Sequence, residues 1–123
     1  MQVIYNGGFK FSYTCPDEQN LTLGEEYKVT YKKIRGLHTL IKVKDANGKR
    51  LDGEFDASHF TDAAHRTHFI ESLKTREKVK FTTINNCIYD YSGNFIFTCE
   101  QLINLAHENG WKLSFEKGEV SLH

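Results

Sequence analysis

Residues 21–60 read LTLGEEYKVTYKKIRGLHTLIKVKDANGKRLDGEFDASHF, and this stretch decides the fold. Apolar and polar residues alternate along residues 27–32 and again along 39–44, which is the pattern of half-buried strands. Gly36 separates the two runs, and residues 45–48 supply Asn and Gly, which tolerate the positive φ of a hairpin turn. The stretch therefore predicts antiparallel strands joined by tight turns. The side chains expected to face the core are Tyr27, Val29, Tyr31, Ile41 and Val43.

The segments on either side extend this sheet. Residues 9–15 alternate in the same way and predict another strand, which begins after Gly7-Gly8 and ends before Pro16. After the hairpin, Leu51, Gly53 and Phe55 continue the inward row, and Gly53 marks a bend where the sheet curls. We therefore expect residues 1–60 to form a small antiparallel β-barrel.

A family resemblance rests on the opening of this stretch. Leu21-Thr22-Leu23-Gly24-Glu25-Glu26-Tyr27-Lys28-Val29 resembles the L-T-x-G-x-x-Y-x-V opening of small SH3-like modules found in phage and bacterial proteins. Asp45, Asn47-Gly48 and the Phe55 to Phe60 ending resemble the rest of that pattern, so the likeness covers about residues 9–60. The resemblance implies an SH3-like barrel, and it implies no particular chemistry.

Residues 61–123 change character and predict helices mixed with hairpins. A helix is expected over 61–78, with Thr61 or Asp62 as its cap, and a strand over 79–84. A hairpin is expected around 90–94, followed by a helix that starts at the Thr98–Gln101 capping box. The fold class is therefore α+β. The helix after Thr98 is expected to end at Gly110, and a last hairpin is expected across 117–118. The expected domains are an SH3-like barrel over 1–60 and an α+β part over 61–123 that packs on it.

Composition narrows the class of protein. The chain has 123 residues, 39% of them hydrophobic and 26% charged, which are ordinary values for a globular domain. Basic and acidic residues balance at 16 each, so net charge directs the protein toward no particular partner. The odd number of cysteines, three, favours reduced thiols over a disulfide framework. Because the first residues lack the regions of a signal peptide and no apolar run is long enough to cross a bilayer, we expect a cytoplasmic protein with no membrane contact.

Positive charge is concentrated between residues 28 and 50, where Asp45 is the only acidic residue. Alternation would place Lys28, Lys32, Lys42 and Lys44 side by side on the outer face of paired strands, which is unfavourable unless an anion binds there. The face suits an acidic protein partner or a nucleic-acid backbone, and it also suits plain solvation. The carboxylates of Asp52, Glu54 and Asp56 would neutralise part of it by pairing with Lys42 or Lys44.

Histidines and cysteines are the other residues that could bind a metal or act as nucleophiles. His59, His65 and His68 fall within ten residues with Asp62 nearby, which suggests a metal site or, more simply, surface histidines. Cys87 and Cys99 lack the surroundings of a nucleophile and are simplest as small core residues, although Cys99 lies at the expected helix N-terminus. We therefore expect no catalytic residue and no cofactor.

The resulting hypothesis is a non-enzymatic binding protein. The SH3-like resemblance suggests a phage-encoded accessory protein that binds and inhibits a host protein, such as a defence component, in the bacterial cytoplasm. The alternatives are a nucleic-acid-binding protein that uses the same lysines and a small metal-dependent enzyme at His59, His65 and His68. Residues expected to contact the partner are Lys28, Lys32, Arg35, Lys42 and Lys44, with Tyr91 as an aromatic anchor.

Overall fold

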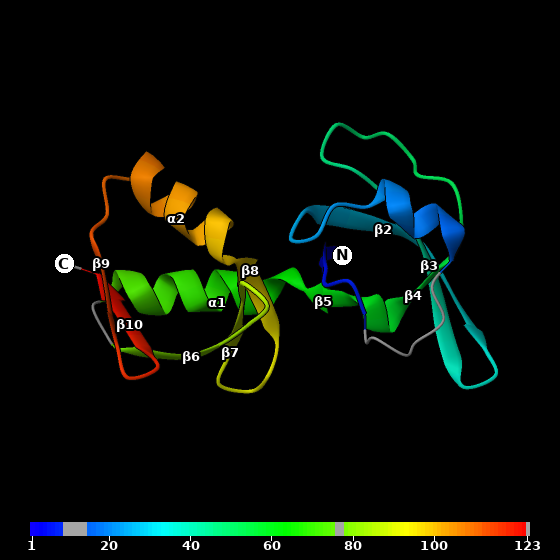
Figure 1. Cartoon of the computed structure of the whole chain (residues 1–123). Coiled ribbons are helices and arrows are strands. Elements are labelled where there is room, and N and C mark those ends of the chain that lie inside the picture. Colours follow the sequence, from blue (N-terminus) through cyan, green and yellow to red (C-terminus); the bar gives the residue numbers. More distant parts are fainter. Residues whose placement is uncertain (9–14, 76–77, 123) are drawn as a thin grey trace. The chain divides into compact units, whose positions relative to one another are not determined.

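The computed structural model describes residues 1–8, 15–75 and 78–122. This part of the chain is mixed α+β, with two antiparallel five-stranded sheets and two α-helices (Figure 1), so the predicted fold class is confirmed. The chain divides into two compact units, Met1–Ala63 (unit 1) and Ala64–His123 (unit 2). The expected packing of residues 61–123 on the N-terminal part stays a prediction.

Unit 1 is built on a single sheet whose paired strands all run antiparallel. The strand order across this sheet is β4-β3-β2-β1-β5. Its elements are β1 (Gln2–Tyr5), the 3₁₀ helix η1 (Pro16–Asn20), β2 (Glu26–Arg35), β3 (His38–Lys44), β4 (Phe55–Asp56), the 3₁₀ helix η2 (Ala57–His59) and β5 (Phe60–Asp62).

This sheet is open, because its two edge strands, β4 and β5, do not pair with each other in the described part of the chain. The closed barrel that the sequence predicted is therefore not observed. The edge strands are nevertheless consecutive along the chain and are joined only by the three residues of η2. A link of that length keeps the facing strand ends within about 14 Å of each other, so the sheet is strongly curled.

Short strands account for the main differences from the prediction. Alternation did not reveal β1 or β5, which have only four and three residues. The strand predicted to return after the 45–48 turn is mostly missing, since only a bridge between Lys44 and Arg50 precedes β4. Most of the strand predicted over 9–15 lies outside the described residues.

Gly53 marks the bend that the sequence assigned to it. Its φ is +102°, which favours glycine, and a Cβ placed there would lie 2.8 Å from Asp17 Oδ2. The backbone therefore passes close to η1 at this point, instead of continuing as a strand.

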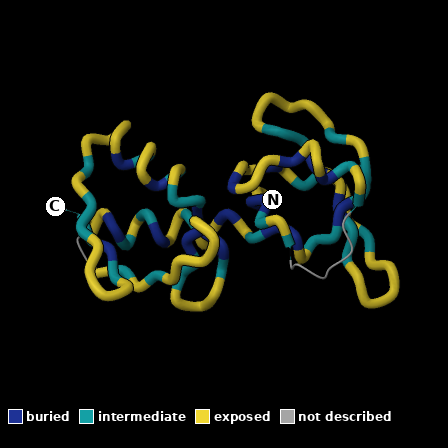
Figure 2. The backbone as a smooth tube through the Cα atoms, in the orientation of Figure 1, coloured by how far each residue is buried: buried dark blue, intermediate teal, exposed yellow. Residues whose placement is uncertain are grey.

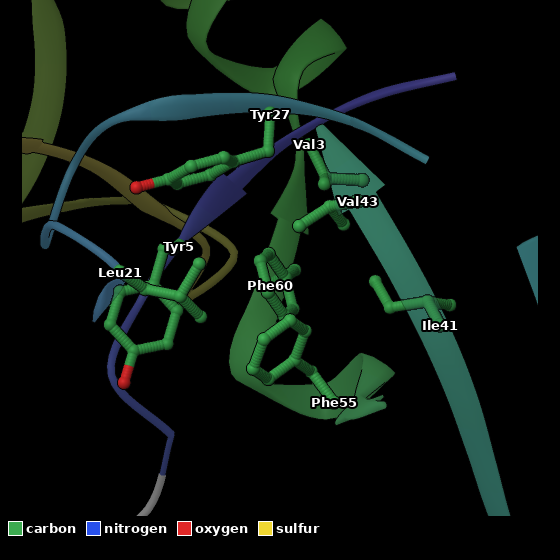
Figure 3. Packing of buried hydrophobic residues seen from close by; sticks show 8 residues of the cluster. All are labelled: Val3, Tyr5, Leu21, Tyr27, Ile41, Val43, Phe55 and Phe60. Carbon is green, nitrogen blue, oxygen red and sulfur yellow. The ribbon is translucent and has the colours of Figure 1, made fainter. Parts of the chain in front are cut away.

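The core of unit 1 is aromatic and aliphatic. Phe55 and Phe60 lie beside each other with ring centroids 6.2 Å apart, and Ile41 and Val43 face them from β3 (Figure 3). Tyr27 meets Phe60 edge to face, which is a favoured aromatic geometry. The expected inward direction of Tyr27, Ile41 and Val43 is confirmed, since all three are buried, and Val29 packs against the same cluster.

Unit 2 has a second five-stranded sheet, ordered β8-β7-β6-β10-β9, and both α-helices. The strand predicted over 79–84 and the hairpins around 90–94 and 117–118 are confirmed. Asn85 and Asn86 both have positive φ and form the turn between β6 and β7. The elements are α1 (Ala63–Lys74), β6 (Val79–Ile84), β7 (Cys87–Asp90), β8 (Phe95–Thr98), α2 (Cys99–Glu108), β9 (Leu113–Glu116) and β10 (Glu119–Leu122).

Both ends of α2 are as the sequence predicted. The Thr98 hydroxyl accepts from the Gln101 N–H at 3.1 Å, and the Gln101 side chain accepts from the Thr98 N–H at 3.0 Å, which completes the capping box. At the other end Gly110 has φ +68°, and the Trp111 N–H donates to the Ala106 carbonyl at 2.8 Å. This is the Schellman arrangement, and it turns the chain toward β9.

Apolar residues from both helices and from three strands of the sheet form the core of unit 2. Phe69 of α1 and Phe97 of β8 meet edge to face, with ring centroids 6.2 Å apart. In Figure 2 buried segments of α1 and α2 alternate with exposed ones, as expected for helices that cover a core with one face. The fully or nearly buried members are Phe69, Leu73, Ile88, Ile96, Phe97, Leu102 and Val120.

Candidate functional site

The β2–β3 hairpin holds most of the predicted contact residues. Together β2 and β3 carry six lysine or arginine side chains and one glutamate, Glu26. Lys28 lies directly opposite Lys44, so the predicted side-by-side placement of cations is confirmed for this pair. Like charges at facing positions destabilise a hairpin, and an anionic partner would relieve that repulsion.

A β-bulge between Val29 and Tyr31 changes which side chains share a face. Beyond it Tyr31 faces Lys42, and Lys32 faces the buried residue Ile41. The prediction that Tyr31 points to the core is therefore wrong: its side chain is 46% exposed, and Lys42 Nζ lies 5.6 Å from the centre of its ring. An extra residue in one strand reverses the alternation of every residue after it, and nothing in the sequence pattern shows where it is inserted.

The same bulge separates the predicted lysines. Lys28, Lys42 and Lys44 lie on one face together with Arg35, whereas Lys32 leaves from the opposite face and is exposed to solvent. One face of the hairpin therefore carries four of the predicted cations. Lys32 is not part of that face.

The carboxylates of Glu54 and Asp56 pair with other residues of the hairpin than those predicted. Lys33 Nζ lies 3.0 and 3.1 Å from the carboxylate oxygens of Glu54, and His38 Nδ1 lies 3.3 Å from Asp56 Oδ2. The expected pairing with Lys42 or Lys44 is wrong. Within the described part of the chain, no carboxylate forms an ion pair with the side chains of Lys28, Lys32, Arg35, Lys42 and Lys44.

The pKa values of these carboxyl groups reflect the charge around them. The hydrogen bond from Lys33 lowers the pKa of Glu54, and the charges of Lys42 and Arg35 act in the same direction. Burial opposes ionisation of Asp56, but hydrogen bonds from the Ser58 N–H and hydroxyl lower its pKa overall. Hydrogen bonds therefore favour the ionised form of both carboxyl groups, and nearby cations add to this effect at Glu54.

The base and the tip of the hairpin differ in charge balance. A pocket of about 340 Å³ at the base is lined by Lys28 and Lys44, but also by Glu26 and Asp45, so its charges are mixed. Toward the tip, residues 34–38 are all exposed, and Figure 2 shows this end of the β2–β3 hairpin in the colour of exposed residues.

Two aliphatic residues at the tip were missed by the sequence reasoning. Ile34 is 78% exposed, and Leu37 is fully exposed. They flank Gly36 in a run of cations, and the signal that would have revealed them is apolar residues at a turn, where polar ones are usual. Lys32 shares the face of Ile34, and Arg35 lies between the two aliphatic residues along the chain, so this end of the hairpin offers both apolar and cationic groups, as protein interfaces do.

A second pocket, of about 320 Å³, adjoins the same hairpin. It is lined by Arg35, His38 and Leu40 of the hairpin and by Cys15 and Glu18 from the η1 region, with Glu54 and Asp56 completing its wall. Arg35, one of the predicted contact residues, is exposed and also lines this pocket.

Glu18 at this pocket belongs to a buried hydrogen-bond network. His59 Nδ1 donates to Glu18 Oε1 at 2.8 Å, and the Tyr5 hydroxyl donates to the same oxygen at 3.1 Å. The Cys15 N–H donates to Glu18 Oε2 at 3.0 Å. Burial, followed by the negative charge of Glu18, raises the pKa of Tyr5 to about 12. The network ties η1 to η2 and β1 inside unit 1.

The predicted histidine site is not assembled as expected. His59 is 0% exposed, one ring nitrogen is used by Glu18, and the other lies against the backbone of Gly8, where a Cβ would come within 2.7 Å of it. It is therefore a core histidine and not a ligand open to solution. No group of three or more His, Cys, Asp or Glu side chains suited to a metal ion occurs among the residues that the structure describes.

The remaining predicted residues lie in unit 2. His65, His68 and Tyr91 line one pocket of about 360 Å³ together with Lys78 and Lys80. Tyr91 is exposed on the second hairpin, with Lys80 Nζ 5.3 Å from the centre of its ring. Its role as an anchor stays a prediction.

The two cysteines of unit 2 fill structural positions. Cys87 is buried on β7, and burial raises the pKa of its thiol, which disfavours the thiolate that a nucleophile needs. Cys99 is the first residue of α2 and is half-buried against the core.

Comparison of the chain with protein-family models, with curated proteins and with solved structures gives no match. Neither α1 nor α2 has the length and apolar character of a membrane-spanning helix. Evidence on function therefore comes from the sequence and from the geometry of the hairpin.

Proposed function

We propose that this protein is a non-enzymatic binding protein that contacts an acidic partner protein through the outer half of the β2–β3 hairpin. The observation that carries the proposal is the combination of exposed Ile34 and Leu37 with cations that lack a carboxylate partner in the described part of the chain, among them Arg35 and Lys42. Apolar contacts would supply affinity, and the cations would select an acidic surface and speed association.

The resemblance to SH3-like modules of phage and bacterial proteins suggests which kind of partner is bound. The strongly curled meander of unit 1, with η2 joining its two edge strands, supports an SH3-like module whose sheet approaches closure. On that basis the partner is a host protein in a bacterial cytoplasm, and binding by a phage-encoded chain would inhibit it.

Nucleic acid is the competing ligand. Strand-face lysines suit a phosphate backbone, but single-stranded nucleic acid is held mainly by stacking on aromatic rings, and Tyr31 is the sole exposed aromatic residue described on β2 and β3. The tip carries aliphatic side chains instead, which favours a protein partner.

The test is capture from a bacterial lysate, with and without nuclease treatment, by four matched forms of the protein. Wild type and a control variant, Lys112→Glu in unit 2, should retain the same protein band. The Arg35→Glu/Lys42→Glu variant and the Leu37→Ser variant should each lower the captured amount by about tenfold or more, since they remove rim charge and apolar contact respectively. Capture that nuclease abolishes, or that Leu37→Ser leaves unchanged while it falls steeply with salt, would assign the hairpin to nucleic acid.

A further inference from the structure

The outer edge of β2 is the longest unpaired strand edge among the described residues. Strand β2 spans ten residues, yet β1 pairs only with Glu26, Tyr27 and Lys28. The Val29 N–H makes the last bond on that side, to the Met1 carbonyl at 2.9 Å. From Tyr31 to Arg35 the strand pairs with β3 alone within the described part of the chain.

We infer that this edge, Tyr31–Arg35, binds an extended acidic segment of the partner as an added β-strand. The inference rests on the proposed function and specifies how the hairpin would hold an acidic protein. Strand addition uses main-chain hydrogen bonds for affinity and alternate side chains for selectivity. The other edge strands are shorter: β4 has two residues, β5 three, and β8 and β9 four each.

The register shows which backbone groups face outward. Gly36-Leu37 forms a two-residue turn between Arg35 and His38, so these two residues make up the hydrogen-bonded pair next to the turn. Hydrogen-bonded and non-bonded pairs alternate along an antiparallel ladder. The N–H and C=O groups of Ile34 and Lys32 therefore point away from β3, toward the incoming strand.

Charge distinguishes a foreign strand from a second copy of this chain. Two β2 edges paired antiparallel through Lys32 and Ile34 would place Lys33 directly opposite Lys33 of the other copy, which is destabilising. Lysine on an edge strand is a common protection against such self-pairing. An incoming strand with carboxylates facing Lys32 and Arg35 would instead be attracted by the positive charge of this edge.

The side chains also set the pattern of the ligand. Lys32 and Ile34 leave from one face of β2, and Ile34 is largely exposed. An incoming segment would therefore place an acidic residue opposite Lys32 and an apolar residue opposite Ile34. The ligand class is an extended peptide in which acidic and apolar residues occur on the same face.

The test uses a fluorescent peptide rich in glutamate and valine and the same peptide N-methylated at alternate backbone nitrogens. The two peptides carry equal charge, but the methylated one lacks the N–H groups of one edge. On the protein, Ile34→Pro removes the outward N–H at a position where an edge strand tolerates proline, and Ile34→Ala keeps it. Amide dispersion in NMR spectra checks that each variant is folded.

Strand addition predicts that the plain peptide binds and that methylation lowers its affinity by about tenfold or more, as expected when main-chain hydrogen bonds are lost. The Ile34→Pro variant should lose binding by a similar factor, whereas Ile34→Ala should lose much less. Amide exchange at Lys32 and Ile34, but not at Lys33, should slow on binding in the wild-type protein.

Equal binding of both peptides would overturn strand addition and leave the proposed function standing, because charge alone would then explain the attraction. Failure of the plain peptide, while capture from lysate still depends on Arg35 and Lys42, would also overturn it. If the wild-type protein forms a dimer and the Ile34→Pro variant is a monomer, the edge would be assigned to a second copy instead.

Discussion

The two units are stabilised by cores of different composition. Each has a five-stranded antiparallel sheet, but the buried charged and polar residues of the described chain, Glu18 and His59, both lie in unit 1. The core cluster of unit 2 is apolar and is covered by α1 and α2. Unit 1 has no α-helix among its described residues apart from Ala63, at which α1 begins, and it depends instead on a curled sheet with polar links between its 3₁₀ helices.

The difference shows how a small sheet can be held in one arrangement. Apolar packing tolerates rearrangement as long as volume is kept, whereas a buried hydrogen-bonded network is satisfied in only one geometry. The Glu18 carboxylate accepts from the N-cap residue of its own 3₁₀ helix and from two other segments, β1 and η2, so a shift of any of them leaves a buried polar group unpaired. Unit 1 therefore gains a defined arrangement at the cost of sensitivity to changes in charge.

The largest expected effect comes from removing Glu18. In the Glu18→Ala variant the donors on Tyr5, Cys15 and His59 lose their buried acceptor, which should destabilise unit 1 by about 3–5 kcal/mol. Methyl NMR signals of Val3 and Val43 report unit 1 during urea unfolding, and fluorescence of Trp111, the single tryptophan, reports unit 2. The control is Asp52→Ala, which changes an exposed carboxylate of the same unit. A loss of under about 1 kcal/mol, the net value of one ordinary hydrogen bond, would contradict the role of the network.

Truncation of the apolar core should affect the other unit. Leu73 is fully buried on α1, and Leu73→Ala should destabilise unit 2 by about 2–5 kcal/mol through lost apolar contact and the cavity left behind. The urea midpoint of Trp111 fluorescence measures the change. Ile103→Ala on α2 is the matched control because its side chain is exposed, and it should shift the midpoint little. A pH-dependent loss in Leu73→Ala would break the contrast, since no charge is involved.

A smaller effect separates the units at alkaline pH. The folded-state pKa of Tyr5 is raised from 10.0 to about 12, so its contribution to stability is complete below pH 10 and is lost as pH rises toward about 12. Unit 1 of the wild type should therefore weaken over this window, and the Tyr5→Phe variant should lack that part of the decline.

Methyl NMR signals of Val43 during urea unfolding at several pH values measure this decline. At neutral pH the Tyr5→Phe variant should be less stable by about 1–3 kcal/mol, because one hydrogen bond to a charged acceptor is lost. Tyr89→Phe in unit 2 is the comparison, since burial also raises the pKa of Tyr89 but no carboxylate contributes. Identical alkaline slopes for wild type and Tyr5→Phe would show that Tyr5 is not the titrating group.

Local chemistry explains which elements were predicted. Lys117 and Gly118 adopt positive φ where the sequence placed a turn, and the Thr98–Gln101 box starts a helix where it was expected. The strands β2 and β3 follow from the alternation of apolar and polar residues along 27–32 and 39–44. The cationic residues of the candidate site were predicted for the same reason, because charge density is visible in the sequence itself.

The features that were missed depend on contacts between distant residues. The bulge after Val29 exposes Tyr31, and its position follows from the pairing of β2 with β3 as a whole. Glu18 and His59 are 41 residues apart, and each alone would be read as a surface residue. Neither the edge at Lys32 and Ile34, which has no outer partner strand among the described residues, nor the partners of Glu54 and Asp56 have a local signal.

The α+β class, the turns and the caps of α2 are readable from local sequence, because they depend on the φ preferences and hydrogen bonds of neighbouring residues. The local sequence also shows that positive charge gathers along residues 28–50. The pairing of distant segments sets which face each lysine takes, which histidine is buried and which strand edge lacks a neighbour among the described residues. Those outcomes follow from strand register, and register is a property of paired segments that no single segment contains.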